Sequence, residues 1–199
     1  MQFSDTQMTW ITDIVRKHKD LLKEDRLDDV FEILPKRLIK DVLASHAFFM
    51  YCYENIPDLL YRIKTIPGYA FYDAKLDTDL VFPNNITRFA PDCFHGLRAQ
   101  SITLPDNLES TSSNMFYNVK LKTLILPSKL QTINHNCFIS AKITEPVKLP
   151  DSITYISRLA FQKSTINFVH SHKLSGLVAE PDLQTCLQEY SPNTKFTMV

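Results

Sequence analysis

A short pattern returns along the middle of this chain at a nearly constant spacing. It holds a proline, an aliphatic residue three positions later and a phenylalanine eleven positions after the proline, as in LPDNLESTSSNMF, LPSKLQTINHNCF and LPDSITYISRLAF. The aligned prolines are Pro83, Pro105, Pro127 and Pro150, so consecutive copies lie 22, 22 and 23 residues apart. A fixed period of this length is typical of a solenoid, in which stacked units bury one continuous core.

The phenylalanines extend the pattern by one unit toward the N-terminus. The aligned residues are Phe71, Phe94, Phe116, Phe138 and Phe161. The first of them implies a unit in which Leu60 takes the place of the proline. We therefore predict five repeats that share an aromatic spine, with one phenylalanine per unit. Their bounds are 60–82, 83–104, 105–126, 127–149 and 150–171.

Each unit ends with a short stretch in which apolar residues recur at every second position, such as SITLP or TLILP. This alternation predicts a β-strand. The alternation places one apolar set inward, and copies of the strand are expected to stack into a parallel sheet. The inward pairs are Leu80/Phe82, Ile102/Leu104, Leu124/Leu126 and Val147/Leu149. The segment around each phenylalanine is expected to turn the chain back through an irregular or short helical stretch.

Written as LPxx[LI]xx[I]xxx[small]Fxxxx[LI], the pattern resembles the BspA-like leucine-rich repeats. The resemblance covers residues 60–171, which is 112 of the 199 residues. The chain departs from that family where a glycine or serine usually follows the isoleucine, because Pro67, Ala90 and Asn134 also occupy this position. The resemblance implies a curved solenoid with a binding role, and it implies no catalytic residue and no cofactor.

The flanking segments complete the predicted fold, an α/β solenoid in which a short leucine-rich repeat array with a parallel sheet follows an N-terminal helical cap. Residues 1–59 carry apolar stripes at helical spacing, for example over Pro35–Glu54, and we expect about three helices covering the first repeat's open edge. This cap is either only a cover or also a second binding surface. Residues 172–199 are expected to close the other end with a short helix, Pro181–Tyr190, and the extended piece TKFTMV.

Several function classes find no support in the composition. The formal net charge is +0, so no overall field attracts nucleic acid or an anionic membrane. With only 3 glycines the chain has no glycine-rich phosphate loop, and its 4 cysteines form no CxxC pair. The first residues do not resemble a secretory signal and no apolar run could span a bilayer, so we expect a cytoplasmic protein without a membrane partner.

The residues that could carry chemistry occupy positions that suggest packing. Cys93 and Cys137 precede a spine phenylalanine, where other units have alanine, so both are predicted to be core residues rather than nucleophiles. His170 and His172 could share one strand face, but two imidazoles without a further ligand do not make a zinc site. We therefore predict no catalytic residue, metal or cofactor. An active site in the helical cap is an alternative that no group of residues supports.

The outward positions of the sheet are the candidate binding site, because a repeat array offers an extended surface. The predicted partner-binding residues are Val81, Ser101, Thr103, Thr123, Ile125, Lys148, Phe168 and His170. The predicted function is non-catalytic binding of another protein. The family to which the repeats are similar occurs in bacteria, protists and viruses including phages, which suggests a phage or bacterial effector that blocks a host protein.

The charge distribution supports one alternative. Residues 60–171 carry 12 Lys/Arg and 8 Asp/Glu, whereas residues 1–59 carry 8 and 11. A nucleic-acid-associated protein could use the lysines on one side of the middle repeats. These are Lys120, Lys122, Lys142 and Lys148. The identity of the partner and the oligomeric state stay open.

Overall fold

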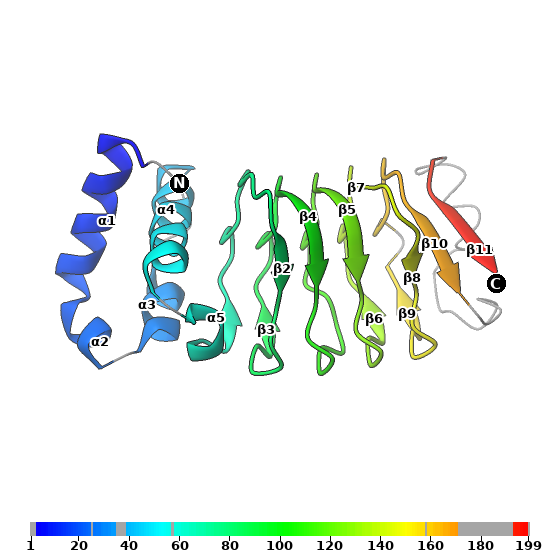
Figure 1. Ribbon diagram of the computed structural model, residues 1–199, viewed down its shortest axis with the longest axis horizontal. Coiled ribbons are helices and arrows are strands. Elements are labelled where there is room, and N and C mark those ends of the chain that lie inside the picture. The colour runs from blue at the N-terminus through cyan, green and yellow to red at the C-terminus, as the bar shows by residue number, and fades with distance from the viewer. Residues whose placement is uncertain are drawn as a thin grey trace.

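The computed structural model describes residues 3–24, 26–34, 39–56, 58–157, 159–170 and 193–198. Helices gather at the N-terminal end, and turns of chain stack beside them in a row toward the C-terminus, as Figure 1 shows. The helices are α1 (Asp5–Lys17), α2 (Lys19–Lys23), α3 (Leu27–Ile33), α4 (Ile39–Asn55) and α5 (Leu59–Arg62). The predicted N-terminal helical region is confirmed, and α5 lies where the first repeat was expected to begin.

The sequence of α1 explains where this helix begins and which side it buries. The Ser4 hydroxyl accepts the backbone N–H of Gln7 at 3.3 Å, and the Gln7 side chain accepts the N–H of Ser4 at 2.9 Å. This reciprocal capping box satisfies two N–H groups that have no partner inside the helix. Ile11 and Ile14, three residues apart on one side of the helix, are buried.

Parallel strands on two sides of each turn form the walls of the solenoid. One wall consists of a four-stranded sheet, in the order β2-β4-β5-β7, and a three-stranded sheet, in the order β11-β10-β8. These strands are β2 (Asp79–Val81), β4 (Arg98–Thr103), β5 (Lys120–Ile125), β7 (Lys142–Ile143), β8 (Val147–Lys148), β10 (Asn167–His170) and β11 (Lys195–Met198). The other wall pairs β1 (Thr65–Ile66) with β3 (Arg88–Phe89), and β6 (Thr132–Ile133) with β9 (Tyr155–Ile156). All these pairs are parallel, which confirms the predicted solenoid.

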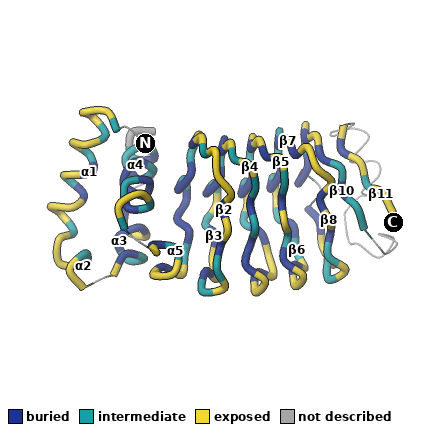
Figure 2. Tube along the Cα trace, in the orientation of Figure 1, coloured by how far each residue is buried: buried dark blue, intermediate teal, exposed yellow. Residues whose placement is uncertain are grey.

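Buried residues recur in every turn of the stack (Figure 2), and their side chains form one continuous hydrophobic cluster. The predicted phenylalanine spine lies within it, and the centroids of neighbouring spine rings are 5.0–5.6 Å apart. The backbone N–H of each of the first four spine residues donates to the carbonyl of the residue that precedes the next one. Phe116, for example, donates to Cys137 at 2.8 Å. Backbone bonds and ring packing therefore hold successive turns in the same register.

The turn around each spine phenylalanine uses left-handed backbone conformations. They occur two residues before the phenylalanine or two residues after it, with φ between 48° and 72°. The residues before it are Tyr69, Asp92, Asn114 and Asn136, and those after it are Asp73, Gly96, Asn118, Ser140 and Lys163. Asparagine and aspartate tolerate this conformation better than most residues, because their short side chains bond to the local backbone. The repeats can therefore turn with few glycines.

The helical cap covers the open edge of the first strand. Asp28 of α3 accepts the backbone N–H groups of Lys64 and Thr65 through its two carboxylate oxygens, at 2.9 and 3.0 Å. Phe49 of α4 packs against Phe71, the first spine residue, with ring centroids 5.2 Å apart. The cap thus gives hydrogen-bond acceptors and apolar surface to an edge strand whose backbone would otherwise lack partners.

At the other end of the array, β11 adds one more parallel strand. It pairs with β10, and the ring of Phe196 lies 5.6 Å from that of Phe161 and 5.2 Å from that of Phe168. The hydroxyls of Ser164 and Thr194 lie 2.6 Å apart and are buried there. The predicted helix Pro181–Tyr190 falls outside the described residues.

Candidate protein-interaction surface

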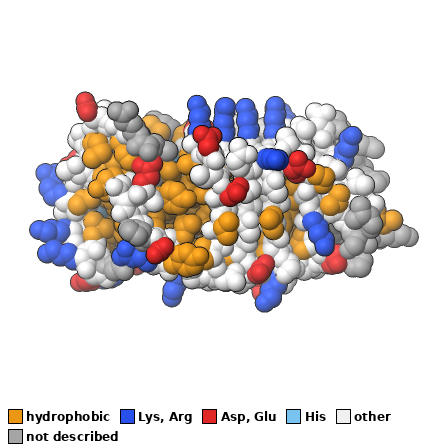
Figure 3. All heavy atoms as spheres, viewed as in Figure 1, with side chains coloured by type: hydrophobic (Ala, Val, Ile, Leu, Met, Phe, Trp, Pro, Cys, Tyr) orange, Lys and Arg blue, Asp and Glu red, His pale blue; other side chains and the backbone are white. Residues whose placement is uncertain are grey.

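The outward positions of the four-stranded sheet bring aliphatic side chains to the surface. Val81, Thr103 and Ile125 are register partners on the adjacent strands β2, β4 and β5, and we call them the aliphatic column. Val81 is 61% exposed and Ile125 is 52% exposed, with the half-buried Thr103 between them. Figure 3 shows hydrophobic side chains that reach the surface of this face.

A groove lies beside the aliphatic column, where the wall of strands is interrupted. β5 pairs with β7 only through its first two residues, and the segment that contains Pro146 then separates β7 from β8. Proline has no backbone N–H to offer a neighbouring strand, so the ladder is not continued there. The groove has a volume of about 460 Å³. Its lining residues are Asp106, Thr123, Leu124, Ile125, Leu126, Ser128, Pro146, Lys148, Pro150, Asp151 and Ser152.

The structure places most of the predicted binding residues on this face. Thr123 and Lys148 line the groove together with Ile125 of the aliphatic column. Ser101 lies in β4, and its hydroxyl donates to the Asp79 carboxylate at 2.6 Å. Ser101 is half-buried and already bonded within the protein, and its part in partner binding stays a prediction.

The assignment of Phe168 to the binding surface was wrong. Phe168 is 0% exposed, and its ring packs against Phe161 with centroids 5.0 Å apart. It lies in register with Val147, an inward residue of β8. Phe168 therefore belongs to the core.

The predicted outward position of His170 is also off by one residue. The cause is a change of spacing within the last repeat. Lys142 pairs with Thr165, 23 residues later, whereas Lys148 pairs with Val169, 21 residues later. Because successive residues of a strand face opposite sides, a slip of one residue exchanges inside and outside. Val169, and not His170, occupies the position beside Lys148.

Analysis of the sequence missed a second surface feature, a file of cations along one rim of the solenoid. Lys75, Arg98, Lys120 and Lys142 each follow a spine phenylalanine by four residues and are paired in register on adjacent turns. All four are exposed. Among the described residues no carboxylate forms an ion pair with any of them. We call these four residues the cation row.

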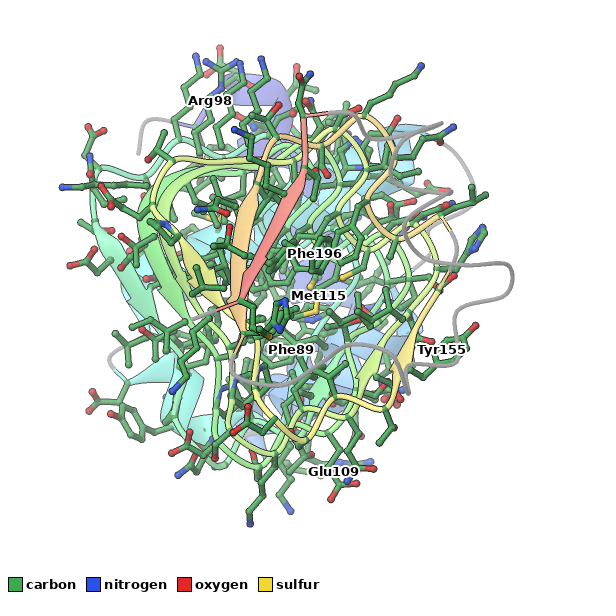
Figure 4. All side chains as sticks on the ribbon, turned by 90° about the vertical axis from the view of Figure 1, so that its right-hand side faces the viewer. Phe89, Arg98, Glu109, Met115, Tyr155 and Phe196 are labelled. Carbon is green, nitrogen blue, oxygen red and sulfur yellow. The ribbon has the colours of Figure 1, made fainter. Side chains whose placement is uncertain are left out.

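The figures show where the cation row lies. Basic side chains stand side by side along the upper rim in Figure 3. Figure 4, viewed along the solenoid, shows Arg98 pointing outward at this rim and Glu109 at the opposite end of the cross-section. The repeat alignment contained the signal, because the position four residues after the phenylalanine is basic in four consecutive units.

The four lysines of the nucleic-acid alternative are exposed on the wall that contains β5, β7 and β8, but they are spread along it. Lys120 and Lys142 belong to the cation row, whereas Lys148 lines the groove beside Ile125. Lys122 is exposed two residues beyond Lys120 on β5. The part of these four lysines in binding nucleic acid stays a prediction.

The family assignment agrees with this geometry. A family profile described as BspA type leucine-rich repeat region, with 6 copies, matches residues 64–176, more than half of the chain. The chain belongs to the BspA-type leucine-rich repeat family. Leucine-rich repeats are generally scaffolds for protein interaction and are typically non-catalytic. No curated protein and no solved structure matches the chain.

Cys93 and Cys137 of the BspA-type repeats are core residues, as predicted, and Cys52 of α4 is buried as well. Burial raises the pKa of Cys52 and of Cys137 to about 12. Burial, with a smaller contribution from Cys137, also raises the pKa of Cys93 well above its ordinary value. A thiol that stays protonated is a poor nucleophile, so the three described cysteines are poorly suited to nucleophilic chemistry.

Because the pKa values of these buried thiols are raised, we expect the free energy of unfolding to fall at alkaline pH. The unfolded thiol ionises near pH 9, the ordinary value, whereas the folded pKa of Cys137 is about 12. A raised folded pKa means that the stabilisation is complete below pH 9 and is lost as the pH rises from 9 toward 12. At pH 10 each such thiol should lower the free energy of unfolding by about 1 kcal/mol.

Urea unfolding at pH 8 and pH 10 checks this prediction, with Cys137→Ala as the matched variant. Alanine fills the equivalent position as Ala70 and Ala160, so the repeats accommodate it. Between pH 8 and pH 10 the free energy of unfolding of the wild type should fall by about 1 kcal/mol more than that of the variant. Equal losses in the two proteins would contradict the assignment.

Metal-binding groups and membrane-spanning helices are absent from the described part of the chain. No group of three or more His, Cys, Asp or Glu among the described residues is arranged to hold a metal ion. Of the predicted histidine pair, His170 is half-buried in β10, and His172 falls outside the described residues. None of the described helices combines the length and the apolar character that crossing a membrane requires.

Proposed function

We propose that this chain is a non-catalytic module that binds another protein through the aliphatic column and the adjoining groove. The observation that carries the proposal is the exposure of Val81 and Ile125 at register-paired positions, with the groove beginning at Ile125. The sheet keeps these side chains exposed to water. A partner that covers them would bury their apolar surface, which favours binding.

The lining of the groove indicates what the partner would present. Ile125, Leu126 and Pro146 offer apolar contacts, so the groove suits an aliphatic or aromatic side chain of the partner. Lys148 and Asp151 line the same groove and can bond to polar groups around that side chain.

Ile125→Arg is expected to remove partner binding while the fold stays intact. The new guanidinium would bring charge into the middle of the contact surface, and an exposed position usually tolerates a substitution within about 0.5 kcal/mol. The measurement is capture from a lysate of the source cells at low and high salt, followed by mass spectrometry. Urea unfolding of the same variant checks the fold.

Gln131→Arg is the matched control, because it adds the same charge at an exposed residue beside β6 on the other wall. One protein that is retained at high salt by the wild type and by Gln131→Arg, but lost from Ile125→Arg, supports the proposal. A host protein in that role would agree with the effector function. Nucleic acid, or a diffuse set of proteins released by salt, would overturn it.

A further inference from the structure

We propose that the cation row binds an acidic α-helix of a partner protein, which lies along the solenoid axis and offers about one carboxylate to each repeat. This inference rests on the proposed function in one respect only, that the partner is a protein. The surface is a different one, because the cation row lies at the start of β4 and β5, whereas the aliphatic column lies at their ends.

The fold does not need the cation row. Its members are exposed and form no ion pair with a described carboxylate, so they contribute little to the packing. Like charges opposite one another on neighbouring strands repel each other. In the next turn the exposed Thr165 takes the same register position beside Lys142, which shows that a neutral residue fits there. Four cations in consecutive turns therefore suggest an anionic partner.

The spacing of the row favours a helix. Neighbouring strands lie about 4.8 Å apart, so the three intervals from Lys75 to Lys142 span about 14 Å. An α-helix rises about 5.4 Å per turn, so carboxylates on four successive turns span about 16 Å. The same-side residues of an extended strand repeat every 6.7 Å or so, and four of them span about 20 Å. The flexible lysine and arginine side chains can take up the small mismatch with a helix.

Other features favour a protein over a nucleic acid as the source of the negative charge. The row is a single file of four cations on a chain whose formal net charge is +0. Proteins that bind single-stranded nucleic acid present aromatic ring faces to the bases. The aromatic residues three positions before Arg98 and Lys120 are His95 and Tyr117, which stack on each other with centroids 4.5 Å apart. In this pair each ring covers one face of the other.

The partner can engage both surfaces if its acidic helix is close to an apolar contact. The strands β4 and β5 each run five residues from the cation row to the aliphatic column, a distance of about 17 Å. A partner that bridges this distance would bind through charge at one end of the strands and through apolar contact at the other. Electrostatic attraction would mainly raise the association rate and select the partner.

The test uses a labelled helical peptide with glutamates at positions i, i+4, i+7 and i+11 on an alanine and glutamine background. A second peptide carries the same four glutamates distributed around the helix, and an oligothymidylate is the nucleic-acid probe. Fluorescence anisotropy with the full chain should show the striped peptide binding about three- to tenfold more tightly than the scrambled one. Its affinity should fall as the salt concentration rises.

The double variant Arg98→Glu/Lys120→Glu should weaken binding of the striped peptide by about tenfold or more, because two attractions become repulsions. The control Lys19→Glu/Lys129→Glu changes the net charge equally at exposed positions outside the row and should leave the affinity within about twofold. Equal binding of the two peptides, or equal loss in the two double variants, would overturn the proposal. Tighter, row-dependent binding of the oligothymidylate would overturn it in favour of nucleic acid.

The same experiment separates this inference from the proposed function. Ile125→Arg should bind the striped peptide as the wild type does, because Ile125 lies at the far end of β5 from Lys120. If the peptide binds but Ile125→Arg captures the partner normally, partner binding by the aliphatic column is ruled out and helix binding by the cation row is supported. If Ile125→Arg loses the partner and the peptide does not bind, the reverse holds.

Discussion

Phe116→Ala is expected to lower the free energy of unfolding by about 3–5 kcal/mol, the usual cost of deleting a buried aromatic ring. Phe116 is the middle residue of the spine and is 0% exposed. Its ring stacks between those of Phe94 and Phe138, with centroid distances of 5.4 and 5.0 Å. The substitution would leave a cavity between two aromatic rings whose turns are fixed by backbone bonds, so the site could collapse only partly.

Urea unfolding followed by circular dichroism measures this loss. Phe116→Leu keeps most of the apolar volume and should cost less than half as much. Tyr117→Ala removes a ring of similar size from the neighbouring, half-buried position and should cost about 1 kcal/mol. A loss below about 1.5 kcal/mol for Phe116→Ala, or an equal loss for Tyr117→Ala, would show that the spine does not carry the packing.

The shape of the unfolding curve gives additional information. Each turn contacts mainly its neighbours, so stability is approximately a sum of repeat and interface contributions. Weakening the central interface could allow the N-terminal and C-terminal repeats to unfold separately. A single transition in the wild type that splits into two in Phe116→Ala would reveal how strongly the two halves are coupled.

Asp28→Ala is expected to destabilise the protein by about 2–3 kcal/mol, because it removes a charged acceptor from two backbone N–H groups. Those N–H groups belong to Lys64 and Thr65. Their nitrogens lie 2.9 and 3.0 Å from the two carboxylate oxygens of Asp28. They lie at the edge of β1 that faces away from β3, and no other strand of the described residues accepts them. The substitution should therefore loosen the contact between α3 and the first repeat.

Asp29→Ala is the matched control for this prediction. Asp29 occupies the same first turn of α3, so both substitutions remove a negative charge from the helix N-terminus. Its carboxylate pairs with the exposed Arg26 at 2.6 Å, and such surface pairs contribute little, so the loss should stay below about 1 kcal/mol. Hydrogen exchange at Lys64 and Thr65 should accelerate only in Asp28→Ala. An equal loss in both variants would rule out the edge-capping role.

The periodic part of the structure was predictable from the sequence. A core position returns once per turn, so a column of identical or similar residues reports burial directly, as the spine from Phe71 to Phe161 does. Strand alternation also identified the inward pairs, of which Ile102 and Leu104 are examples. The exposed residues Val81 and Ile125 followed from the same alternation.

Features without a period were harder to predict. Spacings change within the last units, where 23 residues separate Lys142 from Thr165 but 21 separate Lys148 from Val169, and no residue pattern marks the change. The bonds from Asp28 to the first repeat join positions 36 and 37 residues apart and are not part of any repeating pattern. The cation row is periodic as well, but its signal is a column of charge at exposed positions and not a column of apolar residues.

The regular register has a consequence for how such a chain can change over generations. A tandem duplication of residues 105–126 would insert one whole turn, and the new turn would offer its neighbours the same backbone partners as the old one. The array would lengthen by about 4.8 Å. The duplicate would carry its own copies of Lys120 and Ile125, so both surfaces would grow by one position together. Copy number alone would therefore set the reach of both surfaces, without any point mutation.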